Sequence, residues 1–211
     1  MGKQKFSRDK KTGKKDQLPI ILIVCEGEST EPNYFDQFEV TNIKIETRGM
    51  GCNTKKLVQY AIKASKTKYY DQVWCVFDKD SFPDCNFNDA VQLAKNNNLK
   101  LAYSNESFEL WYNLHFHYLD SQIGRAQYIS KLNKEFKARQ HLAFPNTYQK
   151  NNPNIYQLLK PFQNLAIRNA KKLAKSYIDE TTPSPALQSP VTYVYKLVEE
   201  LNKWKPSQRL D

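Results

Sequence analysis

Two short apolar segments of the chain each end at acidic residues. Residues 20–25 are wholly apolar and are followed by Glu26, and residues 73–77 are wholly apolar and are followed by the segment Asp78-Lys79-Asp80. Runs of this length, rich in β-branched and aromatic residues, indicate strands that are buried on both faces, as in a parallel sheet. Because parallel sheets bind ligands at the carboxyl ends of their strands, we expect these three acids to meet at one edge of the sheet.

Strand-like and helix-like patterns alternate through about residue 103. Ile43 and Ile45 alternate with polar residues, which indicates a strand near the edge of the sheet. The first expected elements are a strand at 20–25, a helix that starts at Ser29 or Thr30 with Pro32 in its first turn, and a strand at 42–47. A helix from Asn53 or Thr54 to about Thr67 and the strand that ends at Asp78 should follow. A turn at 83–86, a helix at 87–97 and a strand at 99–103 complete this part. This alternation predicts an α/β fold with a parallel sheet flanked by helices.

Beyond residue 103 the apolar residues recur at helical spacing. The expected elements are an aromatic helix at 108–116, a helix at 125–139, a surface loop at 141–152, a long helix from Pro153 that Pro161 kinks, a proline-rich connection at 181–190 and a last helix that Ser189 caps and Pro190 starts. We therefore expect a basic flexible arm at 1–16, an α/β domain at 17–118 and a helical C-terminal part at 119–211 packed on it.

The composition favours an anionic partner. The 211 residues include 32 Lys and Arg against 22 Asp and Glu, so the formal net charge is +10. Residues 1–16 carry seven of these basic residues against two aspartates. This arm is interpreted either as a segment that binds nucleic-acid phosphates independently of base sequence or as a solvated tail.

Several protein classes are disfavoured. The four cysteines, Cys25, Cys52, Cys75 and Cys85, show no zinc-binding spacing, so we expect reduced thiols. No apolar run approaches the roughly 18 residues that a membrane span needs, and the N-terminus lacks the apolar core of a signal peptide. We expect a cytoplasmic protein with no membrane association.

The three acids suit a hard divalent cation. On an extended strand Asp78 and Asp80 point in the same direction, with Glu26 on the neighbouring strand. Three carboxylates repel one another unless a cation or a proton holds them, and oxygen-only ligands suit Mg²⁺ or Mn²⁺. Such a metal polarises a phosphate and lowers the pKa of an attacking water. The alternative is that Glu26 only begins a helix and residues 78–80 only form a turn.

These motifs also resemble a known family. Glu26-Gly27 and Asp78-Lys79-Asp80, with the segments CEGESTEPNYF, FDKDSF and SNESFELWYNLHF, resemble the RloB-like branch of the Toprim-domain proteins, which are related to OLD-family nucleases. The similarity covers roughly residues 18 to 118 and, more weakly, the remainder through NIYQLL and VTYVYKLVEEL. The resemblance implies a Toprim/Rossmann-like parallel sheet with a C-terminal helical part, and a Mg²⁺ site for phosphodiester chemistry.

In that resemblance, Glu26 is a metal ligand or general acid/base, and Asp78 and Asp80 hold the metal. It also implies a role in bacterial phage defence beside a partner ATPase. The chain has no room for the tyrosine domain of a topoisomerase or the zinc region of a primase, which favours hydrolysis.

Other charged residues are secondary candidates. Glu109 is a further metal ligand or a structural helix N-terminal acid, and Glu28 and Glu31 lie close enough to contribute. His115 on an aromatic face is interpreted as a core histidine. Lys150 either stabilises the negative charge that develops on a phosphate or is an exposed loop lysine. Four residues at helical spacing form a basic ridge that either holds a nucleic-acid backbone or is a solvated face: Arg168, Lys171, Lys172 and Lys175.

The leading functional hypothesis is a metal-dependent nuclease that cleaves DNA or RNA and is controlled by a partner ATPase. One alternative is a regulatory module that binds a metal or nucleotide without turnover. Another is a phosphodiesterase for a small nucleotide, which has less need of the basic arm.

Overall fold

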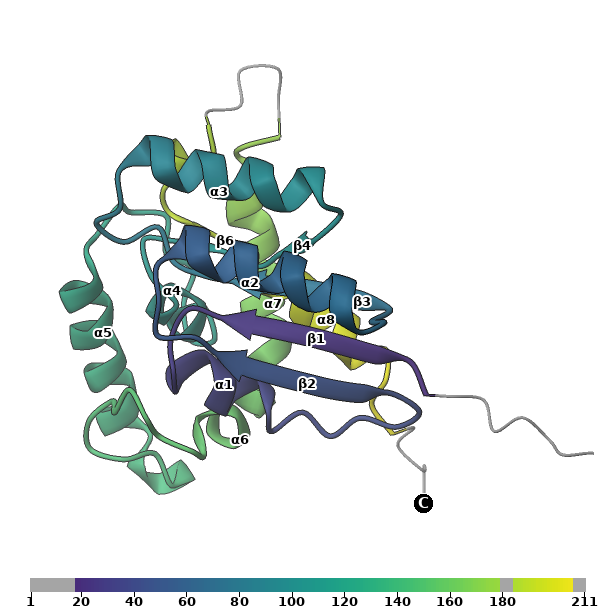
Figure 1. Ribbon diagram of the computed structural model, residues 1–211. Helices are drawn as coiled ribbons and strands as arrows, with labels where there is room; N and C mark the ends of the chain where they lie inside the picture. Colours follow the sequence, from purple (N-terminus) through teal and green to yellow (C-terminus); the bar gives the residue numbers. More distant parts are fainter. Residues whose placement is uncertain (1–17, 179–183, 207–211) are drawn as a thin grey trace, which may run out of the picture.

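A four-stranded parallel sheet forms the centre of the computed structural model, which describes residues 18–178 and 184–206 (Figure 1). The strands lie in the order β2-β1-β3-β4. Their bounds are Ile20–Cys25 for β1, Lys44–Gly49 for β2, Gln72–Val76 for β3 and Lys100–Leu101 for β4. The expected α/β fold is confirmed, and β2 lies at the edge. The basic arm expected at residues 1–16 lies outside the described residues.

Three helices connect these strands. They are α1 (Thr30–Phe35), α2 (Thr54–Thr67) and α3 (Asp84–Asn96), and α2 and α3 lie together on one face of the sheet (Figure 1). Asn53 caps α2, because its side-chain oxygen accepts a hydrogen bond from the Lys56 N–H at 3.0 Å. The expected starts of α1 and α2 are correct, although Ser29, at the N-cap position of α1, makes no capping hydrogen bond through its side chain.

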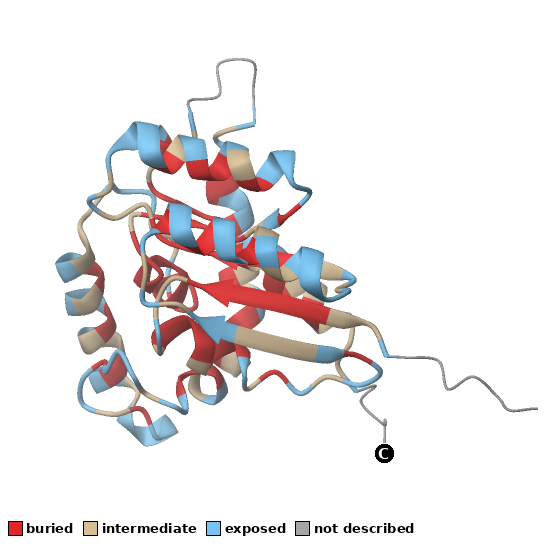
Figure 2. Ribbon diagram, in the orientation of Figure 1, coloured by how far each residue is buried: buried red, intermediate tan, exposed pale blue. Residues whose placement is uncertain are grey.

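Side-chain alternation along β1 divides the hydrophobic core between the two faces of the sheet. Ile21 and Ile23 pack with α1 and the C-terminal helices, whereas Leu22 and Val24 pack with α2 and α3. All four side chains are buried, and Figure 2 shows most of β1 in the colour of buried residues, next to the half-buried and exposed β2. Burial on both faces explains why the strand is apolar without interruption.

The register of β1 and β3 brings their carboxyl ends level. Cys25, the last residue of β1, pairs with Val76, the last residue of β3. The ladder continues one step further, because the Glu26 N–H donates to the Val76 carbonyl at 2.9 Å. The acids that follow the two strands therefore leave the sheet at the same edge.

The C-terminal half is mostly helical and shares the core of the sheet. Its helices are α4 (Glu109–Asn113), α5 (Arg125–Ala138), α6 (Ile155–Leu159), α7 (Gln163–Lys175) and α8 (Val194–Asn202). One hydrophobic cluster contains residues from Ile21 to Leu201, so residues on both sides of the boundary expected near residue 118 are packed together. A second, antiparallel pair joins β5 (Ser104–Asn105) to β6 (Val191–Thr192).

Three expected boundaries are wrong. The turn expected at 83–86 is the start of α3, because Pro83 occupies the N-cap position and Asp84 favours the first turn of the helix. The strand expected at 99–103 is shorter, because β4 ends at Leu101; the chain stays beside the β3 segment through a hydrogen bond from the Ser104 N–H to the Phe77 carbonyl at 3.1 Å, and Ser104 and Asn105 also pair with β6. The last helix begins at Val194 rather than at Pro190, because residues 191–192 pair with β5 and the Thr192 hydroxyl accepts from the Val194 N–H at 3.3 Å.

Pro161 interrupts the long helix, as expected. A 3₁₀-helix at Lys160–Phe162 separates α6 from α7. The loop expected at 141–152 is largely without regular structure after a 3₁₀ turn at Gln140–Leu142, but Phe144 and Tyr148 are buried. Within residues 18–178 and 184–206, no helix has the length and apolar character needed to cross a membrane.

Candidate active site

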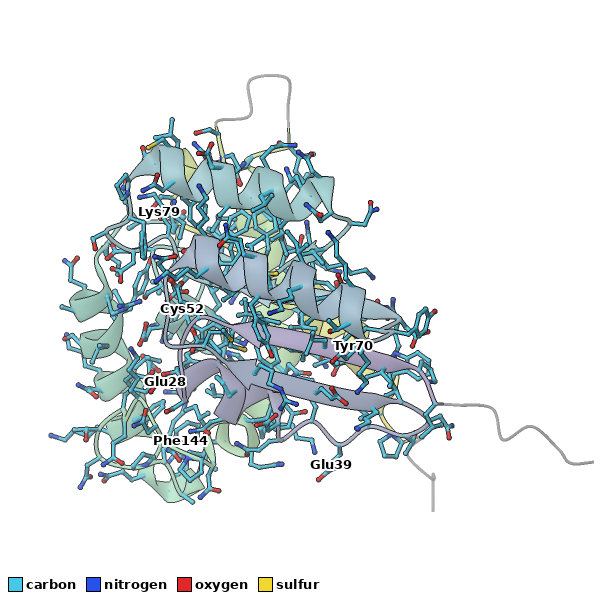
Figure 3. The ribbon with its side chains drawn as sticks, viewed as in Figure 1. Glu28, Glu39, Cys52, Tyr70, Lys79 and Phe144 are labelled. Carbon is cyan, nitrogen blue, oxygen red and sulfur yellow. The ribbon has the colours of Figure 1, made fainter. Side chains whose placement is uncertain are left out.

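A cavity of about 280 Å³ lies where β1 and β3 end. Figure 3 places Glu28, Cys52 and Lys79 at this edge of the sheet, whereas Tyr70 lies at the opposite edge. The cavity is lined by Glu26, Gly27, Thr30, Glu31, Gly51, Cys52, Asn53, Asp78, Asp80, Phe82, Phe108, Glu109, Arg125 and Lys150. The expectation that Glu26, Asp78 and Asp80 meet at one edge is thus met by the geometry.

Glu26 ties the two central strands together. One of its carboxylate oxygens accepts the Asp78 backbone N–H at 3.1 Å, and the other accepts the Thr54 hydroxyl at 3.2 Å. Burial raises the pKa of Glu26, and these two hydrogen bonds partly oppose the rise. Its side chain is thus held between β1, β3 and the start of α2.

Asp78 and Asp80 do not lie on an extended strand, so the prediction of a shared strand direction is wrong. β3 ends at Val76, and Asp80 has a φ of 42°, in the left-handed region that aspartate tolerates better than most residues. The turn is held by hydrogen bonds from the Lys79 and Asp80 N–H groups to the carbonyls of Ser104 and Glu106, at 2.8 and 3.0 Å. Both carboxylates nevertheless reach the same cation.

That cation is Arg125, which the sequence reasoning missed. Its Nη2 lies 2.9 Å from Asp78 Oδ2, its Nη1 lies 3.1 Å from Asp80 Oδ2, and its Nε lies 3.4 Å from Glu109 Oε2. Arg125 is the first residue of α5, where the helix dipole disfavours a cation. A cation at this unfavourable position was the available signal, because acids that lie close to it in the folded protein would offset the effect of the helix dipole.

Glu109 lies in the cavity, in agreement with its selection as a secondary candidate. It is 1% exposed and accepts a hydrogen bond from the Tyr148 hydroxyl at 3.3 Å. Burial, and then the Glu109 charge, raise the pKa of Tyr148, so the hydroxyl stays protonated as a donor. The loop that carries Tyr148 therefore forms part of the wall of the site.

Glu31 is a stronger member of the site than its sequence context indicated. It is 5% exposed, and its Oε2 has no hydrogen-bond partner among the described residues. Burial raises its pKa to about 7, with a further contribution from the Glu109 charge, whereas Lys150 opposes the rise. A Cβ at Gly27 would lie 2.2 Å from this Oε2, so a larger residue after Glu26 would displace the Glu31 carboxylate.

Asp78 is also incompletely satisfied. Its Oδ1 is buried without a hydrogen-bond partner among the described residues, while Oδ2 binds Arg125. Burial and the charges of Glu31 and Glu109 raise the pKa of Asp78, and Arg125 opposes them. The lining contains five carboxyl groups against the two cations Arg125 and Lys150, so full ionisation of these acids would leave negative charge in excess.

The donor chemistry of the cavity fits a hard divalent cation. Its carboxylates offer oxygen ligands only, and two buried oxygens, on Glu31 and Asp78, lack partners in the described chain. In the present arrangement, no three His, Cys, Asp or Glu side chains of the described residues are placed to hold one metal ion. Arg125 instead lies between the carboxylates of Asp78, Asp80 and Glu109.

The other candidates divide between the cavity and the rest of the molecule. Lys150 lines the cavity, whereas the four residues of the basic ridge lie on α7 and do not line it. His115 is a core residue, as interpreted: its Nδ1 lies 2.9 Å from the Trp111 carbonyl, and burial lowers its pKa to about 4. Glu28 does not line the cavity, and all four cysteines are free thiols.

Comparison with known proteins supports one assignment. No curated protein and no solved structure matches the chain. A family model described as RloB-like protein matches residues 21–201, a range that includes every acidic residue of the cavity as well as Arg125 and Lys150. This match extends over most of the chain and across both halves of the fold, and the chain therefore belongs to the RloB-like family.

Proposed function

We propose that this RloB-like protein is a Mg²⁺-dependent nuclease that cleaves phosphodiester bonds of DNA or RNA in the cavity at the ends of β1 and β3. The single observation that carries the proposal is the convergence of five carboxylates on one cavity in a protein of net charge +10. Burying so many like charges costs free energy, which a divalent ion would offset.

Glu26, Asp78 and Asp80 are the residues proposed to hold the ion. When bound there, Mg²⁺ or Mn²⁺ would polarise a phosphate and lower the pKa of an attacking water. Glu26 is well suited to keep its position, because the Asp78 N–H and the Thr54 hydroxyl both bind its carboxylate. The likeness of these motifs to Toprim-domain enzymes points to the same assignment.

The remaining lining residues have complementary roles in the proposal. Glu31, with a pKa of about 7, can accept or donate a proton near neutral pH. Arg125 and Lys150 supply positive charge to phosphate oxygens as negative charge develops during cleavage. The excess of basic residues elsewhere supports a polyanionic substrate over a small nucleotide. By family resemblance, we also propose that a partner ATPase controls this activity in bacterial phage defence.

The test compares purified wild-type protein with Asp78→Asn, Glu26→Gln and Asp89→Asn. Asp89 is exposed on α3 and outside the cavity, so its variant loses the same charge without touching the site. Each protein is incubated with labelled DNA, RNA and tRNA, and with cyclic and linear dinucleotides, in Mg²⁺, Mn²⁺ or EDTA, with and without the partner ATPase.

We expect the wild type and Asp89→Asn to cleave nucleic acid at rates within twofold of each other. Asp78→Asn and Glu26→Gln should cleave at least about 100-fold more slowly, because each loses a carboxylate charge proposed to hold the metal ion. Equal products from the wild type and Asp78→Asn, or no metal-dependent cleavage by the wild type with the ATPase present, would refute the proposal.

A second candidate is a regulatory module that binds a metal or nucleotide without turnover. The observation in its favour is the set of contacts from Arg125 to three carboxylates, which neutralises part of the cluster without a metal. This candidate predicts that Mn²⁺ or a nucleotide raises the melting temperature of the wild type while no substrate is cleaved. The same cleavage assay therefore separates the two functions.

A further inference from the structure

Arg125 contacts the carboxylates that the proposed function needs for a metal ion. Its three guanidinium nitrogens each face a different acid: Nη2 faces Asp78, Nη1 faces Asp80 and Nε faces Glu109, at 2.9, 3.1 and 3.4 Å. Two of these acids are proposed metal ligands. The guanidinium and a divalent ion therefore compete for some of the same oxygens.

The guanidinium satisfies the acidic cluster only in part. The contact of Nε with Glu109 lies within ion-pair distance, but Nε makes no hydrogen bond within the described chain. Asp78 Oδ1 is buried and also lacks a hydrogen-bond partner there. Five carboxyl groups face two cations in this cavity, so their ionisation would leave negative charge that attracts a further cation even while Arg125 is present.

The Arg125 side chain can leave the carboxylates without unwinding its helix. The start of α5 is held by backbone contacts, since the Gly124 N–H donates to the Gln127 side chain at 3.0 Å and the Arg125 N–H donates to Glu106 at 3.4 Å. The side chain itself is 30% exposed, so solvent reaches it. Its place at the helix N-terminus also disfavours its charge.

We infer that Arg125 is an exchangeable counter-ion of the site. Without metal, its guanidinium holds Asp78, Asp80 and Glu109 together. A divalent ion displaces it from Asp78 and Asp80, and the released guanidinium binds a phosphate oxygen of the substrate, for which its planar set of donors is suited. The displacement is a property of the protein and metal alone, whereas the transfer to phosphate rests on the proposed function.

The first experiment measures Mn²⁺ binding by calorimetry in the absence of nucleic acid. Proteins compared are the wild type, Arg125→Ala, Arg125→Lys and Lys134→Ala. Lys134 is an exposed residue of the same helix, so its variant loses one positive charge without touching the cluster. We expect Arg125→Ala to bind Mn²⁺ about tenfold more tightly than the wild type, since it lacks the competing cation. Lys134→Ala should match the wild type.

Arg125→Lys keeps the test informative if Arg125→Ala does not fold without metal. A lysine ammonium presents one compact charge, whereas the guanidinium presents three nitrogens in one plane, so lysine should hold the three acids less well. The Mn²⁺ affinity of Arg125→Lys should therefore exceed that of the wild type. If the wild type binds Mn²⁺ and neither Arg125 variant binds it more tightly, the inference fails while the proposed function stands. If no protein in the set binds Mn²⁺, the inference and the proposed metal site fail together.

The second experiment measures binding of a labelled oligonucleotide in Ca²⁺, which replaces Mg²⁺ as a hard oxygen-seeking ion. In Ca²⁺ we expect Arg125→Ala to bind the oligonucleotide about tenfold more weakly than Lys134→Ala does. In EDTA the oligonucleotide affinities of the two variants should differ by less than threefold. The Arg125 guanidinium that Lys134→Ala retains is then bound to Asp78, Asp80 and Glu109 and does not contact phosphate. Equal affinities of the two variants in Ca²⁺ would overturn the transfer to phosphate.

Discussion

The acidic cavity and the basic ridge of α7 are the two charged regions that the sequence offers as functional, and they differ in how their charges are placed. The cavity draws acids from separate segments of the chain and buries several of them, including Glu31 and Asp78 at 5% and 8% exposure. The ridge draws four cations from one helix, and all four are exposed. Burying charge costs several kcal/mol unless it is offset, whereas an exposed lysine costs almost nothing.

Two ridge residues also have partners within the protein. The Lys171 ammonium lies 2.6 Å from Glu199, and the Lys172 ammonium lies 3.9 Å from the centre of the Tyr118 ring. Exposed pairs of this kind contribute roughly 0–1 kcal/mol. The acids of the cavity are buried at a cost in free energy, so they indicate a function more strongly than the exposed cations along one face of α7 do.

The largest effect on stability is expected for Glu31→Gln in EDTA. The folded-state pKa of Glu31, about 7, lies above its ordinary value of 4.5, so its contribution to stability is complete below pH 4.5 and is lost as pH rises through 7. We expect the variant to be more stable than the wild type at pH 8 by on the order of 2 kcal/mol, with a smaller difference at pH 5. Urea unfolding at the two pH values measures this.

Glu39→Gln is the control for this prediction, because Glu39 is exposed and pairs only weakly with Lys160 at 3.5 Å. Its stability should follow that of the wild type at both pH values. A Glu31→Gln protein no more stable than the wild type at pH 8 would show that charging Glu31 in the cavity costs little.

Gly51→Ala should destabilise the rim of the cavity by about 1–2 kcal/mol. Gly51 has a φ of 55°, and a Cβ there would lie 2.2 Å from the Glu28 carboxylate. Gly124→Ala is the control, since Gly124, next to Arg125, has a φ of −79° and the nearest atom, a Glu106 carboxylate oxygen, would lie 3.8 Å from a Cβ. Chemical denaturation compares the two, and an equal cost at both positions would contradict the role of the left-handed conformation.

Lys150→Ala should weaken nucleic-acid binding about fivefold, since a cation that lines the cavity is lost. Lys137→Ala is the control, because Lys137 is exposed near the end of α5 and outside the cavity. Filter binding in Ca²⁺ measures both affinities. Equal affinities for the two variants would remove Lys150 from the binding surface.

The smallest effect is expected when all four ridge residues are changed to alanine. If each contacted a phosphate, the slope of log affinity against log salt would fall by roughly 3.6, at about 0.9 per contact. We expect a fall of less than about 1, and cleavage within twofold of the wild type. Binding measured across a salt series decides this, and a fall near 3 would place the ridge on the nucleic-acid path.

Local patterns predicted most of the elements, and the errors have a common cause. The apolar runs located β1 and β3, and Asn53 located the start of α2, because these features depend on a few neighbouring residues. The start of α8 was misplaced because Val191 and Thr192 pair with Ser104 and Asn105, a contact between distant segments. A pattern confined to one segment contains no information on such a partner.

The candidate site was also predicted only where local patterns locate its residues. Glu26, Asp78 and Asp80 were found because each follows an apolar strand, and strand ends meet at a sheet edge. Arg125 was missed because it lies 45 residues beyond Asp80 on a helix with no strand context. Glu31 was undervalued because acids are common at helix starts, and only packing shows that its carboxylate is buried.

By itself, the sequence determined that two buried strands end in acids and that a parallel α/β sheet contains them, because apolar runs and helix caps act over a few residues. The tertiary structure alone decided which cation faces those acids, how deeply Glu31 and Asp78 are buried, and which basic residues stay outside the cavity. The physical reason is that burial and electrostatic interaction depend on distances between atoms in space, and segments far apart along the chain supply those atoms.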